Sequence, residues 1–284
     1  MKKIYILILI CICILSAKAQ TITVNKGESI DFQEEKFLTL DTATIRVKYK
    51  QYIINDTSNI NSRKENLMLL QIGKRMSKYT DYNALTGDSL ITVYTKESMD
   101  INTMMGKVRN YMKGNFPETI FKNYPDRKMS TTSFFAANSY KYEEPLISAD
   151  WQLTAGNKTI CGYSCKKATA IFFGRKYIAW YTTQIPTNNG PWKFSGLPGL
   201  ILQVEDEKKQ VAFECITIEK PRWTDNITIP DKSYIKTDKK TFLKTYKQYR
   251  ENPAIILRSS GLIQNDLPAR ALQKRPYNPI ELSE

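Results

Sequence analysis

The stretch from Trp180 to Val204 decides the fold, and it reads WYTTQIPTNNGPWKFSGLPGLILQV. Residues 177–183 are rich in aromatic and β-favouring types, and residues 200–204 are mostly apolar, so each segment predicts a β-strand. Proline and glycine recur between the two segments: Pro186, Gly190, Pro191, Gly196, Pro198 and Gly199. Such a composition excludes a helix, so the sequence predicts a loop that joins two strands.

The loop carries two large apolar rings, Trp192 and Phe194, on either side of Lys193. Apolar rings belong to protein cores more often than to binding sites, so the favoured interpretation is that they plug one end of the sheet. Loops also carry function more often than strands do, which keeps a second hypothesis open, a ligand site on the loop. The candidate ligand-binding residues are then Trp180, Trp192, Lys193 and Phe194.

The end of the loop contains the six-residue motif GLPGLI: Gly196, Leu197, Pro198, Gly199, Leu200 and Ile201. Pro198 and Gly199 suit the second and third positions of a type II turn, because proline presets φ and glycine accepts a positive φ. A second motif, GYxCxKA, matches upstream: Gly162, Tyr163, Cys165, Lys167 and Ala168.

With both motifs, residues 151–205 resemble the GLPGLI family, exported proteins of Bacteroidetes-type bacteria, and the ending at residues 277–282 is similar as well. The resemblance implies work associated with the cell envelope, near outer-membrane transport systems. It implies no particular reaction, because the family has no established biochemical activity.

Residues 1–19 have the layout of a secretory signal peptide: two lysines, a short apolar run and an A-K-A pattern before Gln20. The apolar run is too short to span a bilayer comfortably. Cys11 and Cys13 each follow an isoleucine, whereas a lipoprotein signal has a small residue before its cysteine. We therefore expect residues 20–284 to be periplasmic or extracellular, with neither a lipid anchor nor a transmembrane segment.

Hydrophobic periodicity predicts a β-rich α+β fold. Residues 44–54 alternate apolar and basic side chains, which is typical of a strand with one wet face. Further strands are expected at residues 67–72, 90–94, 131–142, 168–173 and 211–218, with helices at 98–112 and 238–251. A hairpin turn is expected at Gly174-Arg175. We expect residues 20–284 to form a single domain: a curved, largely antiparallel sheet (a sandwich or half-barrel), one or two helices and an extended C-terminal tail.

The composition excludes several kinds of catalysis. The chain contains no histidine, so a Ser-His-Asp triad, a Cys-His pair and any His-dependent zinc site are excluded. No glycine-rich phosphate loop is present, and no metal or cofactor is predicted. Glu143, Glu144 and Asp150 lie within eight residues and invite a general-acid hypothesis, although exposed loop carboxylates are the favoured interpretation.

Three cysteines follow the signal peptide, and an exported protein favours disulfides. If Cys161 and Cys165 shared one strand, about 13 Å would separate them, which is too far for a bridge. A turn at Gly162 would be needed to join them. A bridge between Cys165 and Cys215 is favoured instead, and it leaves Cys161 unpaired.

The formal net charge is +14, but the basic residues are scattered and no nucleic-acid motif accompanies them. We therefore expect solvated surface charge rather than a nucleic-acid partner. The first functional hypothesis is a non-enzymatic envelope binding or accessory module, whose partner is an envelope protein or an apolar or peptide ligand. The alternatives are a His-independent hydrolase that uses carboxylates, and a structural or assembly protein with a large exposed apolar patch.

Overall fold

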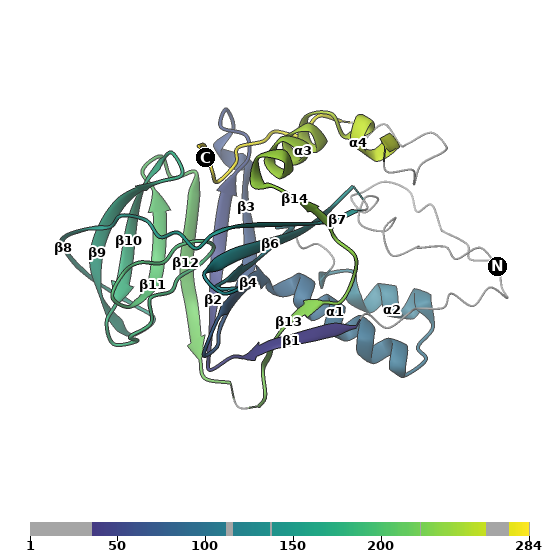
Figure 1. Ribbon diagram of the computed structural model, residues 1–284, viewed down its shortest axis with the longest axis horizontal. Coiled ribbons are helices and arrows are strands. Elements are labelled where there is room, and N and C mark those ends of the chain that lie inside the picture. The colour runs from purple at the N-terminus through teal and green to yellow at the C-terminus, as the bar shows by residue number, and fades with distance from the viewer. Residues whose placement is uncertain (1–35, 112–115, 137, 222, 260–272, 284) are drawn as a thin grey trace.

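The computed structural model describes residues 36–111, 116–136, 138–221, 223–259 and 273–283 (Figure 1). The expected signal peptide and its cleavage site lie outside these ranges. Within them, none of the helices combines the length and the apolar character that crossing a membrane requires.

Twelve strands form one sheet in the order β14-β7-β6-β5-β4-β3-β2-β12-β11-β10-β9-β8, and β1 pairs with β13 in a separate ribbon. Every pairing is antiparallel except that of β14 with β7. The strands are β1 (Phe37–Thr42), β2 (Ile45–Ile54), β3 (Arg63–Ile72), β4 (Ser77–Asp81), β5 (Glu118–Lys122), β6 (Lys128–Phe135), β7 (Asn138–Pro145), β8 (Gln152–Ile160), β9 (Tyr163–Phe172), β10 (Arg175–Thr182), β11 (Leu200–Asp206), β12 (Val211–Glu219), β13 (Asn226–Pro230) and β14 (Ile235–Thr237). The helices are α1 (Tyr82–Lys96), α2 (Ile101–Val108), α3 (Lys239–Glu251), α4 (Pro253–Ser259) and the short 3-10 helix η3 (Ile60–Ser62).

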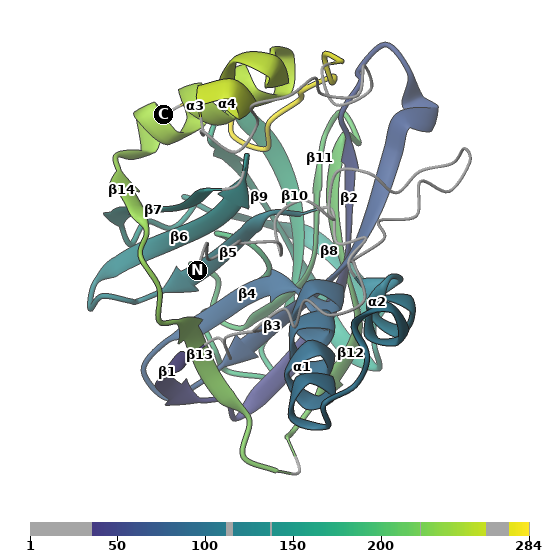
Figure 2. The same cartoon turned by 90° about the vertical axis from the view of Figure 1, so that its right-hand side faces the viewer.

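The large sheet bends strongly, so that β9–β12 run in a different direction from β6 and β7 (Figures 1 and 2). The structure thus confirms the predicted fold class, a β-rich α+β fold with a curved, largely antiparallel sheet. It is one open sheet rather than a sandwich, and the described part contains four α-helices rather than one or two.

The main core lies on the inner face of the bend. Cross-strand register places Tyr49 opposite both Met68 and Cys215, and Tyr79 opposite both Leu70 and Ile120. Paired residues of neighbouring strands point to the same face, so these side chains form rows across the sheet. All six are buried, which agrees with the apolar alternation that predicts strand β2.

Two predicted elements are wrong in type or extent. Residues 90–94 belong to helix α1, which begins after Asp81, whose carboxylate accepts a hydrogen bond from Ala84 N at 3.0 Å. A short apolar run does not distinguish a helix from a strand, and this cap settles the helix. Residues 131–142 contain the end of β6 and most of β7, with a positive φ at Ala136 between them.

The β9–β10 hairpin turns at Phe173-Gly174, not at Gly174-Arg175. Phe172 pairs with Arg175, and the two turn residues have φ values of 46° and 75°. Two positive φ values identify a type I′-like turn. The shift places Arg175 inside β10, where its side chain is buried.

Candidate functional site

The loop between β10 and β11 plugs the inner face of the sheet. Trp192 is 1% exposed and Phe194 is fully buried, as the core interpretation predicts. Their rings contact Phe213, at centroid distances of 6.4 Å and 5.6 Å. Trp151 donates a hydrogen bond from Nε1 to Ser195 O of the loop at 2.7 Å. Neither Trp192 nor Phe194 is available to an external ligand.

The GLPGLI residues fix the close approach of the loop to β10. Gly199 has a φ of 158° and its N–H donates to Leu197 O at 2.8 Å, so this segment is not the expected type II turn. A Cβ at Gly199 would lie 2.1 Å from Thr182 O. Glycine is therefore needed because the backbone of β10 occupies the place of a side chain. Ile201 in turn accepts a hydrogen bond from the Tyr49 hydroxyl at 2.7 Å.

Lys193 lies between the two plug residues and enters a buried ionic cluster. Its ammonium contacts Glu144 Oε1, the Tyr142 hydroxyl at 3.2 Å and Glu281 Oε1 at 2.5 Å. Lys239, at the start of α3, lies 3.1 Å from Glu144 Oε2 and 2.5 Å from Glu281 Oε2. Two lysines thus neutralise two carboxylates that come from β7 and from the C-terminal segment.

The environment of this cluster controls its protonation. Burial by itself lowers the pKa of Lys193, but Tyr142, Glu281 and Glu144 outweigh it and hold that pKa above its usual value. Lys193 therefore remains charged. Burial raises the pKa of the nearby Glu118 carboxyl on β5 to about 7, against the opposing charge of Lys193. The charges of the cluster therefore balance, and the cluster joins the loop, β7 and the C-terminal segment. The neighbouring Glu118 is a carboxyl that can titrate near neutral pH.

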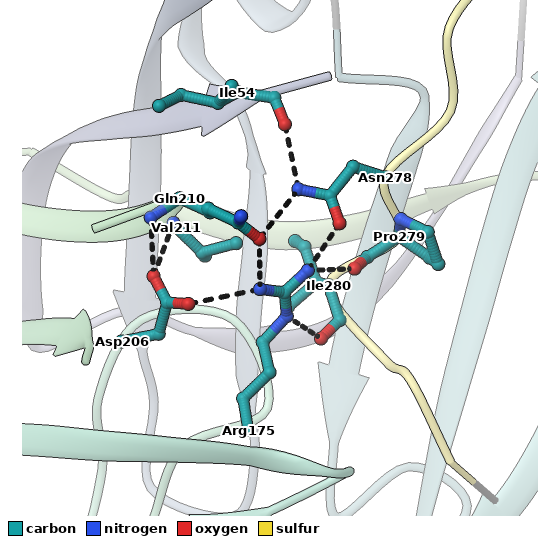
Figure 3. Close-up of polar contacts among 8 residues, drawn as sticks. All are labelled: Ile54, Arg175, Asp206, Gln210, Val211, Asn278, Pro279 and Ile280. Carbon is teal, nitrogen blue, oxygen red and sulfur yellow. Dashed lines mark hydrogen bonds and ion pairs between the residues drawn. The ribbon is translucent and has the colours of Figure 1, made fainter. Parts of the chain in front are cut away.

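Arg175 clamps the C-terminal segment onto the sheet (Figure 3). Its guanidinium donates to Asp206 Oδ2 at 3.0 Å, to Asn278 Oδ1 at 2.7 Å and to Ile280 O at 2.9 Å. Asn278 also donates to Ile54 O at 2.8 Å. Arginine suits this position because its planar fork satisfies several acceptors at once. The sequence interpretation missed this role, because it placed Arg175 in a turn.

Beside the plug, the loop forms one wall of an open hollow with a volume of 340 Å³, which we call the loop groove. It is lined by Ile72, Gly73, Lys74, Arg75, Met76, Ser77, Lys122, Asn123, Leu146, Ile147, Ser148, Thr187, Asn188, Asn189 and Ser195. Three of these residues are basic and none is acidic. The lining itself is therefore basic and hydrogen-bonding, and a carboxylate bonded to it, that of Asp41, accepts from the backbone of Arg75 at 2.8 Å and of Met76 at 3.3 Å.

Two asparagines present amide donors at the loop groove. The Asn188 side-chain oxygen accepts from Gly196 N, and that of Asn189 accepts from Gly190 N at 2.9 Å. Because the loop backbone occupies both oxygens, the NH₂ groups are the ends left for other partners.

Lys122 adds a buried amine, which donates to Gly190 O at 2.6 Å. Burial lowers the pKa of Lys122 to about 7.

Trp180 lies apart from the other predicted ligand residues. It is half-buried on strand β10 and lines a separate hollow of 180 Å³ with Lys158, Lys167, Ile178, Gln203 and Glu205. Lys158 lies 5.8 Å from the Trp180 ring centroid and donates to Gln203 Oε1 at 2.6 Å. The structure thus does not assemble Trp180, Trp192, Lys193 and Phe194 into one site.

The three carboxylates of the hydrolase hypothesis do not converge. Glu143 is exposed and pairs with Lys128 at 3.2 Å, whereas Glu144 points to the opposite side of β7 and joins the buried cluster. Asp150 is exposed beyond the end of β7. Across the described ranges, no three Cys, Asp or Glu side chains form a group that could hold a metal ion.

The cysteine arrangement corrects the expected Cys165–Cys215 bridge. All three are free thiols, and it is Cys161 whose Sγ lies 3.5 Å from Cys215 Sγ. Cys165 is buried with its Sγ 3.5 Å from Tyr163 O. The reason is the β8–β9 turn, in which Cys161 and Gly162 have φ values of 50° and 83°; this turn carries Cys161 off the strand.

Residues 173–203 match a sequence family described as "Protein of unknown function (Porph_ging)". No curated protein matches the chain. Solved structures of PNGF-II in space groups P21 and C2 are similar at a TM-score of 0.49, with 15% and 16% identity, over 74% of this chain and 34% of PNGF-II. The chain therefore spans about a third of the length of PNGF-II. The family match contains Arg175, Lys193, Asn188 and Asn189, so it includes residues of the clamp, the cluster and the loop groove.

Proposed function

We propose that this protein is an exported, non-enzymatic binding module of the GLPGLI type, and that its loop groove binds a small ligand that carries a carboxylate. The observation that supports this most is the lining of the loop groove: three basic side chains, several amide and hydroxyl groups, and no carboxylate. A volume of 340 Å³ suits a ligand of about one or two sugar or amino-acid units.

The electrostatics of the loop groove favour an anion over a neutral ligand. Lys74 and Arg75 are exposed at its rim, while Lys122 is buried at its base. A carboxylate accepts hydrogen bonds only, and the free amide ends of Asn188 and Asn189 donate them. Binding also favours the charged form of Lys122, whose pKa burial holds at about 7, so affinity increases as the pH falls from 8 to 6.

The geometry does not favour a carboxylate-based hydrolase. Glu144 is held by two lysines, and Glu143 and Asp150 lie exposed outside that cluster. An apolar ligand between Trp180, Trp192 and Phe194 is not favoured either, because the latter two rings are buried in the core. The loop groove lies next to the same loop but presents polar rather than apolar groups.

Calorimetric titration tests the proposal with paired probes. D-glucuronate and N-acetyl-Ala-Ala both carry a carboxylate, and D-glucose and N-acetyl-Ala-Ala-amide are their neutral counterparts. Binding of at least one carboxylate probe but neither neutral probe is expected, and the pair that binds identifies a sugar acid or a peptide C-terminus. Equal affinity for charged and neutral probes, or no binding to any of them, contradicts the proposal.

A charge-reversal pair separates the loop groove from general surface charge. Lys74→Glu changes the rim, while Lys208→Glu makes the same change in net charge at an exposed turn between β11 and β12. We expect Lys74→Glu to weaken carboxylate binding about tenfold, the effect of about 1.4 kcal/mol, and Lys208→Glu to leave it within about twofold. Equal weakening by both variants would point to non-specific attraction instead.

A further inference from the structure

The turn between β8 and β9 brings two distant thiols together on the inner face of the sheet. Cys161 and Cys215 are 54 residues apart, yet their sulfurs are 3.5 Å apart, and Cys161 Sγ also lies 3.2 Å from Cys215 O. In the sheet order, β10 and β11 separate β9 from β12. Neighbouring strands lie about 4.8 Å apart, so a flat sheet would keep β9 and β12 roughly 14 Å apart.

The curl of the sheet brings the β8–β9 turn close to β12, and the conformation of this turn directs Cys161 toward Cys215. Cys161 and Gly162 adopt the paired positive φ values of a type I′-like turn, a place where Asn, Asp or Gly is preferred at the first position. A cysteine there is conformationally costly, and its side chain is directed across the sheet. β12 is also irregular at this point, with a register shift between Cys215 and Thr217.

We propose that Cys161 and Cys215 are a disulfide-forming pair that staples the edge hairpin β8–β9 to the central strand β12 when a disulfide-bearing oxidant is present. Cys161 is exposed and meets the oxidant first, while Cys215 is 7% exposed and lies behind it. Cys165 lies near this pair, close enough to raise the pKa of the Cys215 thiol further. We assign it no bond, because it is fully buried and its Sγ contacts Tyr163 O at 3.5 Å, whereas Cys161 Sγ and Cys215 Sγ contact each other.

The reaction is a thiol–disulfide exchange in two balanced steps. The Cys161 thiolate attacks one sulfur of the oxidant, forming a mixed disulfide and releasing the first thiol of the oxidant. Cys215 then loses its proton and attacks Cys161 Sγ, which forms the intramolecular bond and releases the second thiol. The protein loses two hydrogens, and the oxidant gains them. Burial and the neighbouring Cys161 raise the pKa of the Cys215 thiol, so the second step accelerates as the pH rises.

The test uses the full chain, oxidised glutathione as the probe oxidant, and alkylation followed by peptide mapping without reduction. A Cys161–Cys215 linked peptide is expected in the wild-type protein and in Cys165→Ala, and in neither Cys161→Ala nor Cys215→Ala. A bridge that includes Cys165, a stable glutathione adduct on Cys161 without closure, or full alkylation of Cys161 and Cys215 would each overturn the proposal.

Thermal unfolding provides a second readout. Reducing the oxidised wild-type protein and the oxidised Cys165→Ala variant should lower the melting temperature of both by several degrees. The Cys161→Ala variant, altered at an exposed turn, should melt at the same temperature before and after reduction. If a variant fails to fold, the peptide maps of the wild-type protein and Cys165→Ala still decide the question. A reduction effect that persists in Cys161→Ala contradicts the assignment.

Discussion

The Lys193 ammonium lies 2.5 Å from Glu281 Oε1, although 88 residues separate them in the sequence. This contact joins the Pro/Gly-rich loop to the C-terminal segment inside the protein. Lys193 is fully buried, so each partner depends on the other to avoid an unpaired buried charge. We therefore expect a variant that destabilises the loop to destabilise the C-terminal segment as well, and the reverse.

Replacing Lys193 by methionine removes one charge of this buried cluster. Glu144 and Glu281 then share Lys239 alone, and an uncompensated buried carboxylate costs about 3–5 kcal/mol of unfolding free energy. The matched control is Lys176→Met, which removes an exposed ion pair with Glu207 and should cost below about 1 kcal/mol. Urea unfolding measures both. Equal losses in the two variants would show that the cluster contributes no special stability.

The Arg175 clamp predicts a local effect as well as a global one. Arg175→Met leaves the buried Asp206 carboxylate without its ion-pair partner and removes the hydrogen bonds to the C-terminal segment. We therefore expect a loss of about 3–5 kcal/mol of unfolding free energy. Amide hydrogen exchange should increase at residues 277–282 more than on the strands. Arg127→Met, whose side chain is 93% exposed, is the control and should stay within about 0.5 kcal/mol. Unchanged exchange at residues 277–282 would contradict the clamp.

Two glycines should respond to alanine in opposite directions. Gly199→Ala places a Cβ 2.1 Å from Thr182 O, so the loop must move away from β10 and the protein loses about 2–4 kcal/mol. At Gly106 in α2 nothing lies within 4 Å of an added Cβ. Alanine there should stabilise the helix by about 0.5–1 kcal/mol. Denaturant unfolding that ranks the variants the other way would exclude the described loop geometry.

The buried Lys122 should make the free energy of unfolding depend on pH. Its pKa is about 7 in the folded protein and 10.5 ordinarily, so the unfolded chain binds more protons between these values. The contribution of Lys122 to the unfolding free energy therefore increases as the pH rises from 7 toward 10. The difference between the wild-type protein and Lys122→Met isolates this contribution, because other titrating groups cancel. A difference that stays flat over this range would mean that Lys122 is not desolvated.

The sequence predicts the elements whose pattern is local. Alternation over residues 44–54 predicts β2 because one face is wet and the other buried. Residues 238–251 likewise predict α3, whose cap is Asp238, accepting from Thr241 N at 2.8 Å. The strand prediction for residues 90–94 is wrong because a short apolar run has no periodicity that distinguishes a strand from a helix. The Asp81 cap, outside that run, decides the helix.

The site depends on contacts that no local pattern contains. Lys193 is a candidate from its place between two rings, but its partners Glu144 and Glu281 come from strand β7 and the C-terminal segment. The Cys161–Cys215 contact likewise requires the positive φ of Cys161 and the curl of the sheet. The amide donors of Asn188 and Asn189 could have been noticed as neighbours on the loop, although their orientation follows from backbone contacts.

The central claim, that the loop groove binds a carboxylate, is tested most directly by NMR of the side-chain amides during titration with D-glucuronate and N-acetyl-Ala-Ala. We expect the NH₂ resonances of Asn188 and Asn189 to shift in a saturable way with at least one of these probes. They should not shift with the corresponding neutral probe. The indole resonance of Trp180, in the separate hollow, should stay in place. Shifts confined to Trp180, or no saturable shift at either asparagine, would contradict carboxylate binding at the loop groove.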